Sequence, residues 1–278
     1  MSAAIPTYWV DAFVADGLRG NPAAVCRLTD PLSEGQMRAI AAEMNLSETA
    51  FLAPPTVAQG PVGIRWFTPE VEVPLCGHAT LASGHVLLIE EAAGGRERVT
   101  FGSASGPLGA ERVGDAVRIA LPREEPVPAT LPAEIVAALG VPATSSVARG
   151  PRSRKLLIEL PTPEAVVAVR PEFGALLRSV REEEVSGIVV TARGRDGIDF
   201  VSRFFAPWAG VPEDPVTGSA HALLGPYWQA RLGVARFRAR QLSRRGGEMA
   251  VDVGEQAVRL TGRSRVVARG AIDLSALP

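Results

Sequence analysis

The sequence predicts an α+β protein built from two similar domains. The chain has 278 residues, of which 46% are hydrophobic, and this length suits one large domain or two of roughly 140 residues each. Short β-rich runs alternate with a few helical segments along the whole chain. A motif of the first half also recurs in the second half at an offset of 138 residues (203 − 65 = 138). We therefore expect two domains related by a pseudo-twofold axis.

The first half contains one strongly marked helix. Residues 33–45 place Met37, Ile40 and Met44 on one face, and Ser33 with Gln36 forms a capping box. A second helix of small and apolar residues begins near residue 77. Strands are expected at 8–14, 50–52, 63–67, 99–101 and 117–121.

The second half follows the same order after a proline-rich, charged stretch at residues 122–128. Proline cannot donate to a sheet ladder, so this stretch is interpreted as the linker between domains 1–121 and 122–278, with the last strand able to return to the first domain. Helices are expected at 132–139 and 171–180, both opened by proline. Strands are expected at 156–160, 187–191 and 200–205, and Gly246-Gly247 indicates a hairpin turn.

The repeat itself consists of RWFTP followed by VPLCG at residues 65–69 and 73–77, and of RFFAP followed by VPEDP at 203–207 and 211–215. Each copy leads into a helix that starts with small residues, Gly77 in the first and Gly218-Ser219 in the second. Small residues leave the N–H groups of a helix start open to anions. Two such starts would bind a carboxylate and stabilise negative charge developing beside it. The alternative is that the two glycines only permit tight packing of helix on strand.

Cys76 and Asp214 occupy the same offset in the two copies, just before these helices. Cys76 is either a small buried hydrophobic residue or a thiol activated by the helix start. Asp214 either forms a turn or orients a histidine. His78 opens the first helix, where a neutral imidazole can donate to a substrate oxygen. His221 lies near the start of the second helix, and both structural and functional roles remain open for it.

Glu48 precedes the apolar pair Phe51-Leu52, so it enters a hydrophobic environment. Burial would raise its pKa and suit it to general acid–base chemistry, although a lone glutamate in a loop is more often solvated. His85 lies two helical turns after His78, too far away to share a metal ion with it, and is interpreted as a core or interface residue. We expect no metal, because no ligands have metal spacing along the chain, and no cofactor.

Charge and motif content exclude several classes of function. The net charge is −1, so no basic excess favours nucleic acid. No P-loop, no dinucleotide-binding glycine motif and no G-x-S-x-G occurs. With no signal segment and no membrane-spanning stretch, a cytoplasmic protein is expected.

Four motifs resemble the phenazine biosynthesis PhzF-like family: residues 20–25 (GNPAAV), 45–49 (NLSET), 76–80 (CGHAT) and 213–220 (EDPVTGSA). The resemblance implies a diaminopimelate epimerase-like fold, in which each domain is a curved mixed β-sheet or barrel around a central helix and the site lies between the domains. It also implies a homodimer and a cofactor-independent isomerisation of a small carboxylate, as with trans-2,3-dihydro-3-hydroxyanthranilate.

By the same resemblance, Glu48 corresponds to the catalytic acid–base and His78 and Asp214 to supporting catalytic residues. We expect the substrate-binding positions to be Asn21, Cys76, Gly77, Gly218 and Ser219. Related racemases use one cysteine from each domain, and this chain has Cys76 but Asp214 at the second position. Two alternatives remain: a non-catalytic metabolite-binding or interaction protein, and a racemase that depends on Cys76.

Overall fold

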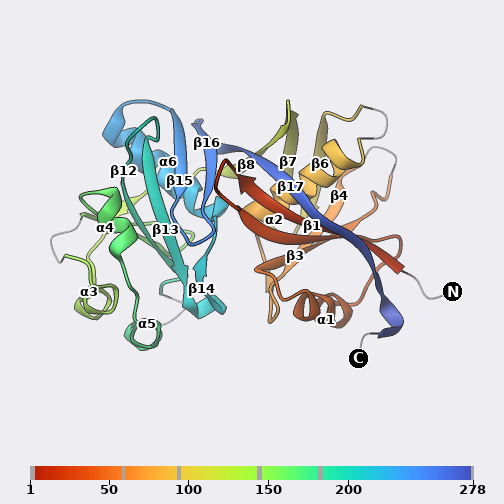
Figure 1. Cartoon of the computed structure of the whole chain (residues 1–278), viewed down its shortest axis with the longest axis horizontal. Helices are drawn as coiled ribbons and strands as arrows, with labels where there is room; N and C mark the ends of the chain where they lie inside the picture. The colour runs from red at the N-terminus through yellow and green to blue at the C-terminus, as the bar shows by residue number, and fades with distance from the viewer. Residues whose placement is uncertain (1–3, 58–59, 93–94, 143–145, 181–183, 277–278) are drawn as a thin grey trace. The chain divides into compact units, whose positions relative to one another are not determined.

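The computed structural model describes residues 4–57, 60–92, 95–142, 146–180 and 184–276. The chain divides into two compact units. The first unit comprises Met1–Leu121 and Leu260–Pro278, and the second comprises Pro122–Arg259. Both units are mixed α/β structures (Figure 1).

In its described residues, the first unit has the strands β1 (Ala4–Val14), β2 (Asn21–Arg27), β3 (Glu48–Ala53), β4 (Val62–Phe67), β5 (Glu72–Val73), β6 (Arg98–Ser103), β7 (Gly106–Val113), β8 (Ala116–Pro122) and β17 (Ala257–Asp273). Strand β17 begins in the second unit. Its helices are α1 (Glu34–Met44) and α2 (Gly77–His85), followed by a π-helical turn (Val86–Glu90) and, near the end of the chain, a 3₁₀ turn (Leu274–Ala276).

Eight of these strands close into a barrel. β1 pairs with β2 and with β17, and the ring continues through β3, β4, β6, β7 and β8, which pairs with β17 again. Helix α2 contacts β1, β2, β3 and β7, and all of its residues are buried, so it fills the barrel (Figure 1). A helix of small residues fits this space. A Cβ added at Gly84 would stand 2.9 Å from the Val117 side chain.

Helix α1 covers β3 and β4 from outside. Its predicted capping box is confirmed, because the Ser33 hydroxyl accepts the Gln36 N–H and the Gln36 side chain accepts the Ser33 N–H. Met37 and Ile40 pack on Phe51 and other residues of one hydrophobic cluster. The amphipathic face predicted for residues 33–45 is therefore the face that packs on the barrel.

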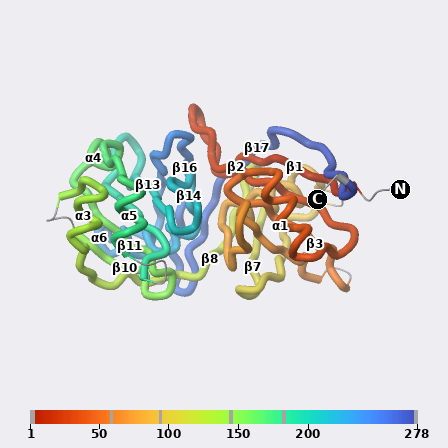
Figure 2. Tube along the Cα trace, turned by 90° about the horizontal axis from the view of Figure 1, so that it is seen from below, coloured from red at the N-terminus to blue at the C-terminus, as the bar shows by residue number. Residues whose placement is uncertain are grey.

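The second unit contains β9 (Val127–Pro128), β10 (Ser146–Arg149), β11 (Lys155–Glu159), β12 (Gly187–Arg193), β13 (Phe200–Ala206), β14 (Val211–Asp214), β15 (Arg236–Gln241) and β16 (Gly247–Val253). Its helices are α3 (Ala133–Leu139), α4 (Pro163–Ala168), α5 (Phe173–Ser179) and α6 (Gly218–Leu232), with a 3₁₀ turn at Pro207–Ala209. Helices α3 and α5 pack against each other (Figure 2).

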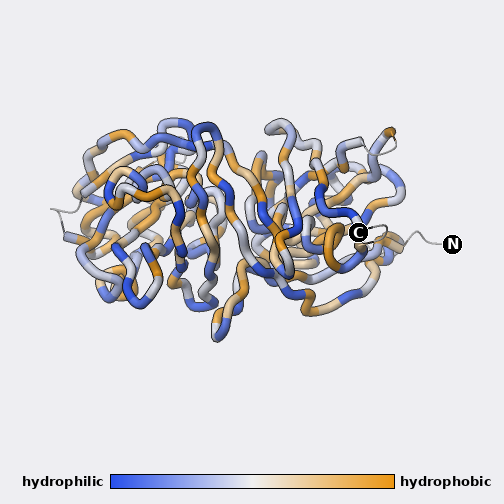
Figure 3. Tube along the Cα trace, turned by 90° about the horizontal axis from the view of Figure 1, so that it is seen from above, coloured by the Kyte–Doolittle hydropathy of each residue, from blue (hydrophilic) through white to orange (hydrophobic). Residues whose placement is uncertain are grey.

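Strand pairing in the second unit repeats that of the first. The antiparallel pair β10–β11 corresponds to β1–β2, and the parallel pair β11–β12 corresponds to β2–β3. The parallel pair β13–β15 likewise corresponds to β4–β6, and α6 stands where α2 stands in the first unit. Buried residues alternate with partly buried or exposed ones along β8 and β16. Hydrophobic and hydrophilic residues follow one another along the trace of both units (Figure 3). The two copies of the sequence motif therefore lie in units whose strands pair in the same order.

The proline-rich stretch at residues 122–128 requires a correction. Val127 and Pro128 form the short strand β9, which pairs with β10, although this stretch was expected not to join a sheet. The register pairs Val127 with Arg149 and Pro128 with Ala148, so the stretch joins the sheet through two residues. Glu124 is buried in the same stretch, where its carboxylate accepts the N–H groups of Arg152 and Ser153, each at 2.7 Å.

No helix in the described ranges is both long enough and apolar enough to span a membrane.

Candidate functional site

Three elements of the first unit begin beside one another and bring predicted site residues together. Strand β2 begins at Asn21 and β3 at Glu48, and the two strands pair in parallel with Ala23 opposite Glu48. Helix α2 begins inside the same barrel, with Cys76 as its N-cap. The parallel register places the starts of β2 and β3 at one end of the sheet, and His78 joins them there.

His78 is the centre of this cluster and is 3% exposed. Its Nε2 lies 3.3 Å from the Oε2 of Glu48. Its Nδ1 lies 3.1 Å from the Asn21 Nδ2 and 3.5 Å from the Cys76 Sγ. Glu48 is more accessible, with 17% of its side chain exposed. One oxygen of the Glu48 carboxylate, Oε2, therefore faces the buried imidazole of His78.

Burial lowers the pKa of His78 to about 3, although a hydrogen bond to the backbone of Pro22 acts in the opposite direction. The imidazole is neutral at physiological pH for that reason. A neutral imidazole beside Glu48 can hold a hydrogen bond without adding a charge to the site.

Because the pKa of His78 is depressed in the folded protein, the unfolded chain binds a proton that the folded chain does not, between pH of about 6.5 and 3. Acidification through this range therefore favours unfolding. We expect the free energy of unfolding of the native protein to fall by about 1.4 kcal/mol more per pH unit than that of His78→Gln. Urea unfolding curves at several pH values in this range measure the difference. Equal slopes would mean that His78 is protonated in the folded state.

Asn21 is fully buried behind His78, where its Oδ1 accepts the Ser47 hydroxyl at 3.3 Å. The preceding turn depends on Gly20, which has a φ of +70° and lies so close to the Ala12 carbonyl that a Cβ would stand 2.2 Å away from that oxygen. The sequence expectation placed Asn21 among the substrate-binding residues. The structure shows it in contact with His78 and Ser47, and substrate binding by Asn21 stays a prediction.

Glu48, Cys76 and His78 also offer three ligand atoms that all lie within 4.8 Å of one another. Carboxylate, thiolate and imidazole are ligand types that zinc accepts. Spacing along the chain did not predict this cluster. Cys76 and His78 are neighbours in the sequence, but Glu48 lies on a different element, at the start of β3. That the protein requires no metal stays a prediction.

In the second unit, α6 begins at Gly218 after Thr217, the N-cap residue. The Thr217 side chain does not cap the helix; its hydroxyl donates to the Asp214 Oδ2 at 2.5 Å. Gly218 is buried and Ser219 is half-buried in the first turn. Cys76 makes no capping hydrogen bond with its side chain either. Both helices therefore start with backbone N–H groups that their N-cap side chains leave open.

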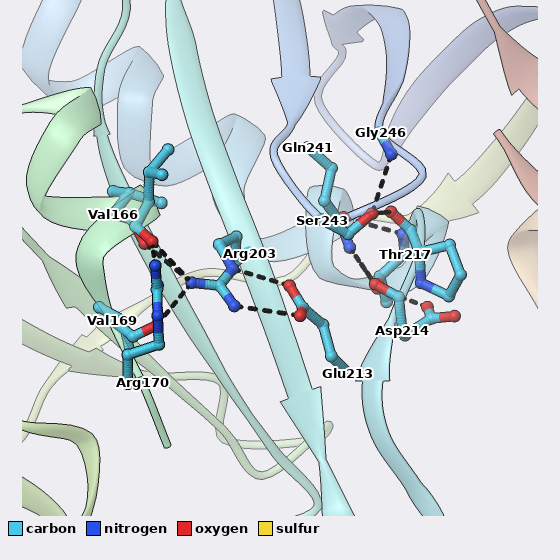
Figure 4. A network of polar contacts seen from close by, with 12 residues as sticks. Val166, Val169, Arg170, Arg203, Glu213, Asp214, Thr217, Gln241, Ser243 and Gly246 are labelled. Carbon is cyan, nitrogen blue, oxygen red and sulfur yellow. Dashed lines mark hydrogen bonds and ion pairs between the residues drawn. The ribbon is translucent and has the colours of Figure 1, made fainter. Parts of the chain in front are cut away.

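The strands before these helices carry the same ion pair in both units. Arg203 of β13 binds Glu213 of β14 through two hydrogen bonds of 2.7 and 3.0 Å, and it also donates to carbonyl oxygens at the end of α4 (Figure 4). Arg65 of β4 binds Glu72 of β5 in the same bidentate manner at 2.7 and 2.6 Å. The two helix starts differ, because three residues separate Asp214 from Gly218 and none separates Cys76 from Gly77.

The remaining histidines and the second cysteine are structural in their contacts. His221 is fully buried, its Nδ1–H donates to the Thr217 carbonyl at 2.8 Å, and burial lowers its pKa to about 4. His85 is buried at the end of α2, as expected for a core residue. Cys26 and Cys76 form no disulfide with each other, and burial raises the pKa of Cys26 to about 12. Three residues that were not predicted support the predicted site residues through their side chains: Ser47, Thr217 and Gln241.

Known structures first define the class. A hydroxyproline epimerase from Agrobacterium vitis, solved with bound trans-4-hydroxy-L-proline, superposes with a TM-score of 0.65 at 15% identity, covering 98% of this chain and 94% of that one. Identity this low supports the fold alone. The protein therefore shares the barrel fold of this epimerase, with strands in addition to the barrel.

Sequence comparison then gives the family. The family model described as phenazine biosynthesis-like protein matches residues 10–270. A Pseudomonas aeruginosa protein named as an uncharacterized isomerase is 46% identical over 268 residues, covering 96% of this chain and 97% of its own. The crystal structure of a PhzF family protein from Enterococcus faecalis has a TM-score of 0.88 at 40% identity, covering 97% of this chain and 99% of that one. The chain belongs to the PhzC-PhzF phenazine biosynthesis-like family.

Proposed function

We propose that this protein is a cofactor-independent isomerase that moves a proton within a small carboxylate substrate. Glu48 is the acid–base, His78 supports it, and the open start of α2 binds the substrate's negative charge. Asp214 and the start of α6 keep the supporting and substrate-binding roles that the family resemblance implies. Relatives named as isomerases support the class of reaction. The proposal includes a cytoplasmic homodimer, as the family resemblance implies.

One observation carries the proposal: Glu48 Oε2 faces a buried imidazole of low pKa, while the rest of the carboxylate stays accessible. In the proposed reaction, Glu48 removes a proton from one substrate carbon and leaves an electron pair that spreads into the adjoining unsaturated system. The resulting carboxylic acid then returns the proton to a different carbon, so that no atom or electron is gained or lost. Backbone N–H groups at a helix start stabilise the charge that appears between the two steps.

The test is a screen for hydrogen exchange in deuterated water. The full-length chain is incubated with trans-2,3-dihydro-3-hydroxyanthranilate and with a panel of small cyclic and amino-acid carboxylates, and deuterium incorporation is followed by mass spectrometry. Incorporation at a carbon position, together with a shifted double bond, supports the proposal. Compounds that bind without any exchange would favour the non-catalytic binding protein instead.

A second candidate, a racemase that depends on Cys76, is favoured by the 3.5 Å contact between the Cys76 Sγ and the His78 Nδ1. It predicts that Cys76→Ala lowers exchange by about 10²-fold or more and that alkylation of the thiol abolishes it. The leading proposal predicts that Cys76→Ala keeps the rate within about tenfold, since Glu48 is intact. Cys26→Ala is the matched control, because Cys26 is also a cysteine outside any disulfide and is fully buried on β2 of the same barrel.

A further inference from the structure

The turn that precedes α6 is held by side chains from the end of β15. Gln241 is fully buried there and makes three hydrogen bonds to this turn. Its Oε1 accepts the Thr217 N–H at 2.9 Å, and its Nε2 donates to the Asp214 carbonyl at 2.7 Å and to the Thr217 Oγ1 at 3.2 Å (Figure 4). Ser243 adds a hydrogen bond from its hydroxyl to the Pro215 carbonyl at 2.7 Å.

The direction of each of these bonds follows from the backbone groups involved. A backbone N–H only donates and a carbonyl only accepts, so the two ends of the Gln241 amide are assigned without ambiguity. The Thr217 Oγ1 accepts from Gln241, and its own proton is directed to the Asp214 Oδ2 at 2.5 Å. A continuous chain of hydrogen bonds thus runs from the buried Gln241 amide through the Thr217 hydroxyl to the Asp214 carboxylate.

Comparison with the first unit shows which of these hydrogen bonds occur only in the second unit. At an offset of 138 from Ser243 (243 − 105 = 138), Ser105 donates to the Pro74 carbonyl at 2.7 Å, so the serine contact is repeated. The position that matches Gln241 (241 − 103 = 138) is Ser103, whose hydroxyl donates to Gly106 within its own turn. Gln241 therefore replaces a residue with a purely local contact, and it does so where the chain has three additional residues before the helix.

We propose that Gln241 is a positioning residue that fixes the Asp214 carboxylate in one orientation beside the start of α6, acting through the Thr217 hydroxyl. The inference rests on the proposed function only for the role of Asp214 in the reaction. The buried amide has no access to substrate, so its effect passes through the turn. Without it, the Thr217 N–H and the Asp214 carbonyl lose a partner, and the Thr217 hydroxyl is free to rotate toward the helix start.

The test reads the Asp214 carboxylate directly and needs no substrate, so its outcome is independent of the exchange screen. The full-length chain is labelled at the side-chain carboxyl carbon of aspartate, and the Asp214 resonance is assigned with Asp214→Asn. We expect Gln241→Met and Thr217→Val to displace or split this resonance, whereas Thr217→Ser, which keeps the hydroxyl, leaves it in place. Ser103→Ala is the control at the matched position of the repeat and leaves it unchanged.

Amide hydrogen exchange distinguishes positioning from general destabilisation. We expect the amides of residues 214–219 to exchange about tenfold faster in Gln241→Met, while those of β13 keep their protection. An unchanged Asp214 resonance in both Gln241→Met and Thr217→Val would overturn the proposal. Equal acceleration of exchange in β13 would do so too, because the role would then be one of stability alone. If Gln241→Met fails to fold, the comparison of Thr217→Val with Thr217→Ser decides.

Discussion

Glu48→Gln is expected to lower the rate of deuterium incorporation into a turned-over substrate by about 10²–10⁴-fold, the range that a general acid–base contributes. Glutamine keeps the size of the side chain and can still approach the His78 Nε2, 3.3 Å away in the native protein, but its amide neither removes nor returns a proton at neutral pH. Exchange into the compound identified by the screen, followed by mass spectrometry in deuterated water, measures the loss.

Glu70→Gln is the matched control, because Glu70 belongs to the same unit and is exposed. It should exchange protons at the native rate. Binding of the substrate to Glu48→Gln should persist within about tenfold, since the start of α2, where the substrate's negative charge is proposed to bind, is not altered. An unchanged exchange rate in Glu48→Gln would remove this residue from the mechanism and leave Cys76 as the remaining candidate base.

The parts of the fold that were predictable are those with strong local signals. The capping box at Ser33 predicted a helix. The repeated arginine and proline motifs predicted an internal duplication. Strand β2 was missed, because residues 21–27 have no alternation: four consecutive residues are buried between β1 and β3. Helix α4 was missed as well, although Thr162 caps it and Pro163 occupies its first turn.

Residue patterns predicted the site residues one at a time. They did not predict that Glu48 and His78 lie in contact. Glu48 and His78 meet because β2 and β3 pair in parallel around α2, a tertiary arrangement that spacing along the chain does not encode. Gln241 gave no signal, since a single glutamine at the end of a strand is normally exposed. Only the fold shows that its amide satisfies the Asp214 carbonyl and the Thr217 N–H.

Arg203→Met is expected to reduce the free energy of unfolding by about 3–5 kcal/mol, far more than the equivalent change in the first unit. The Arg203 side chain is 10% exposed, and it is bonded to Glu213 and to carbonyls of Val166 and Val169 (Figure 4). Methionine retains the packing of the stem but leaves a half-buried carboxylate and these carbonyls without their donor. Urea unfolding at neutral pH measures the loss.

Arg65→Met provides the matched comparison, because Arg65 forms the same bidentate pair with Glu72 and lies over the Phe67 ring as Arg203 lies over Phe205. The Arg65 side chain is 40% exposed, so water replaces the lost partner and a cost of about 0–1 kcal/mol is expected. Adding Glu213→Gln to Arg203→Met should recover part of the loss by removing the stranded charge. Equal costs at the two positions would show that burial of the pair in the second unit does not determine its contribution to stability.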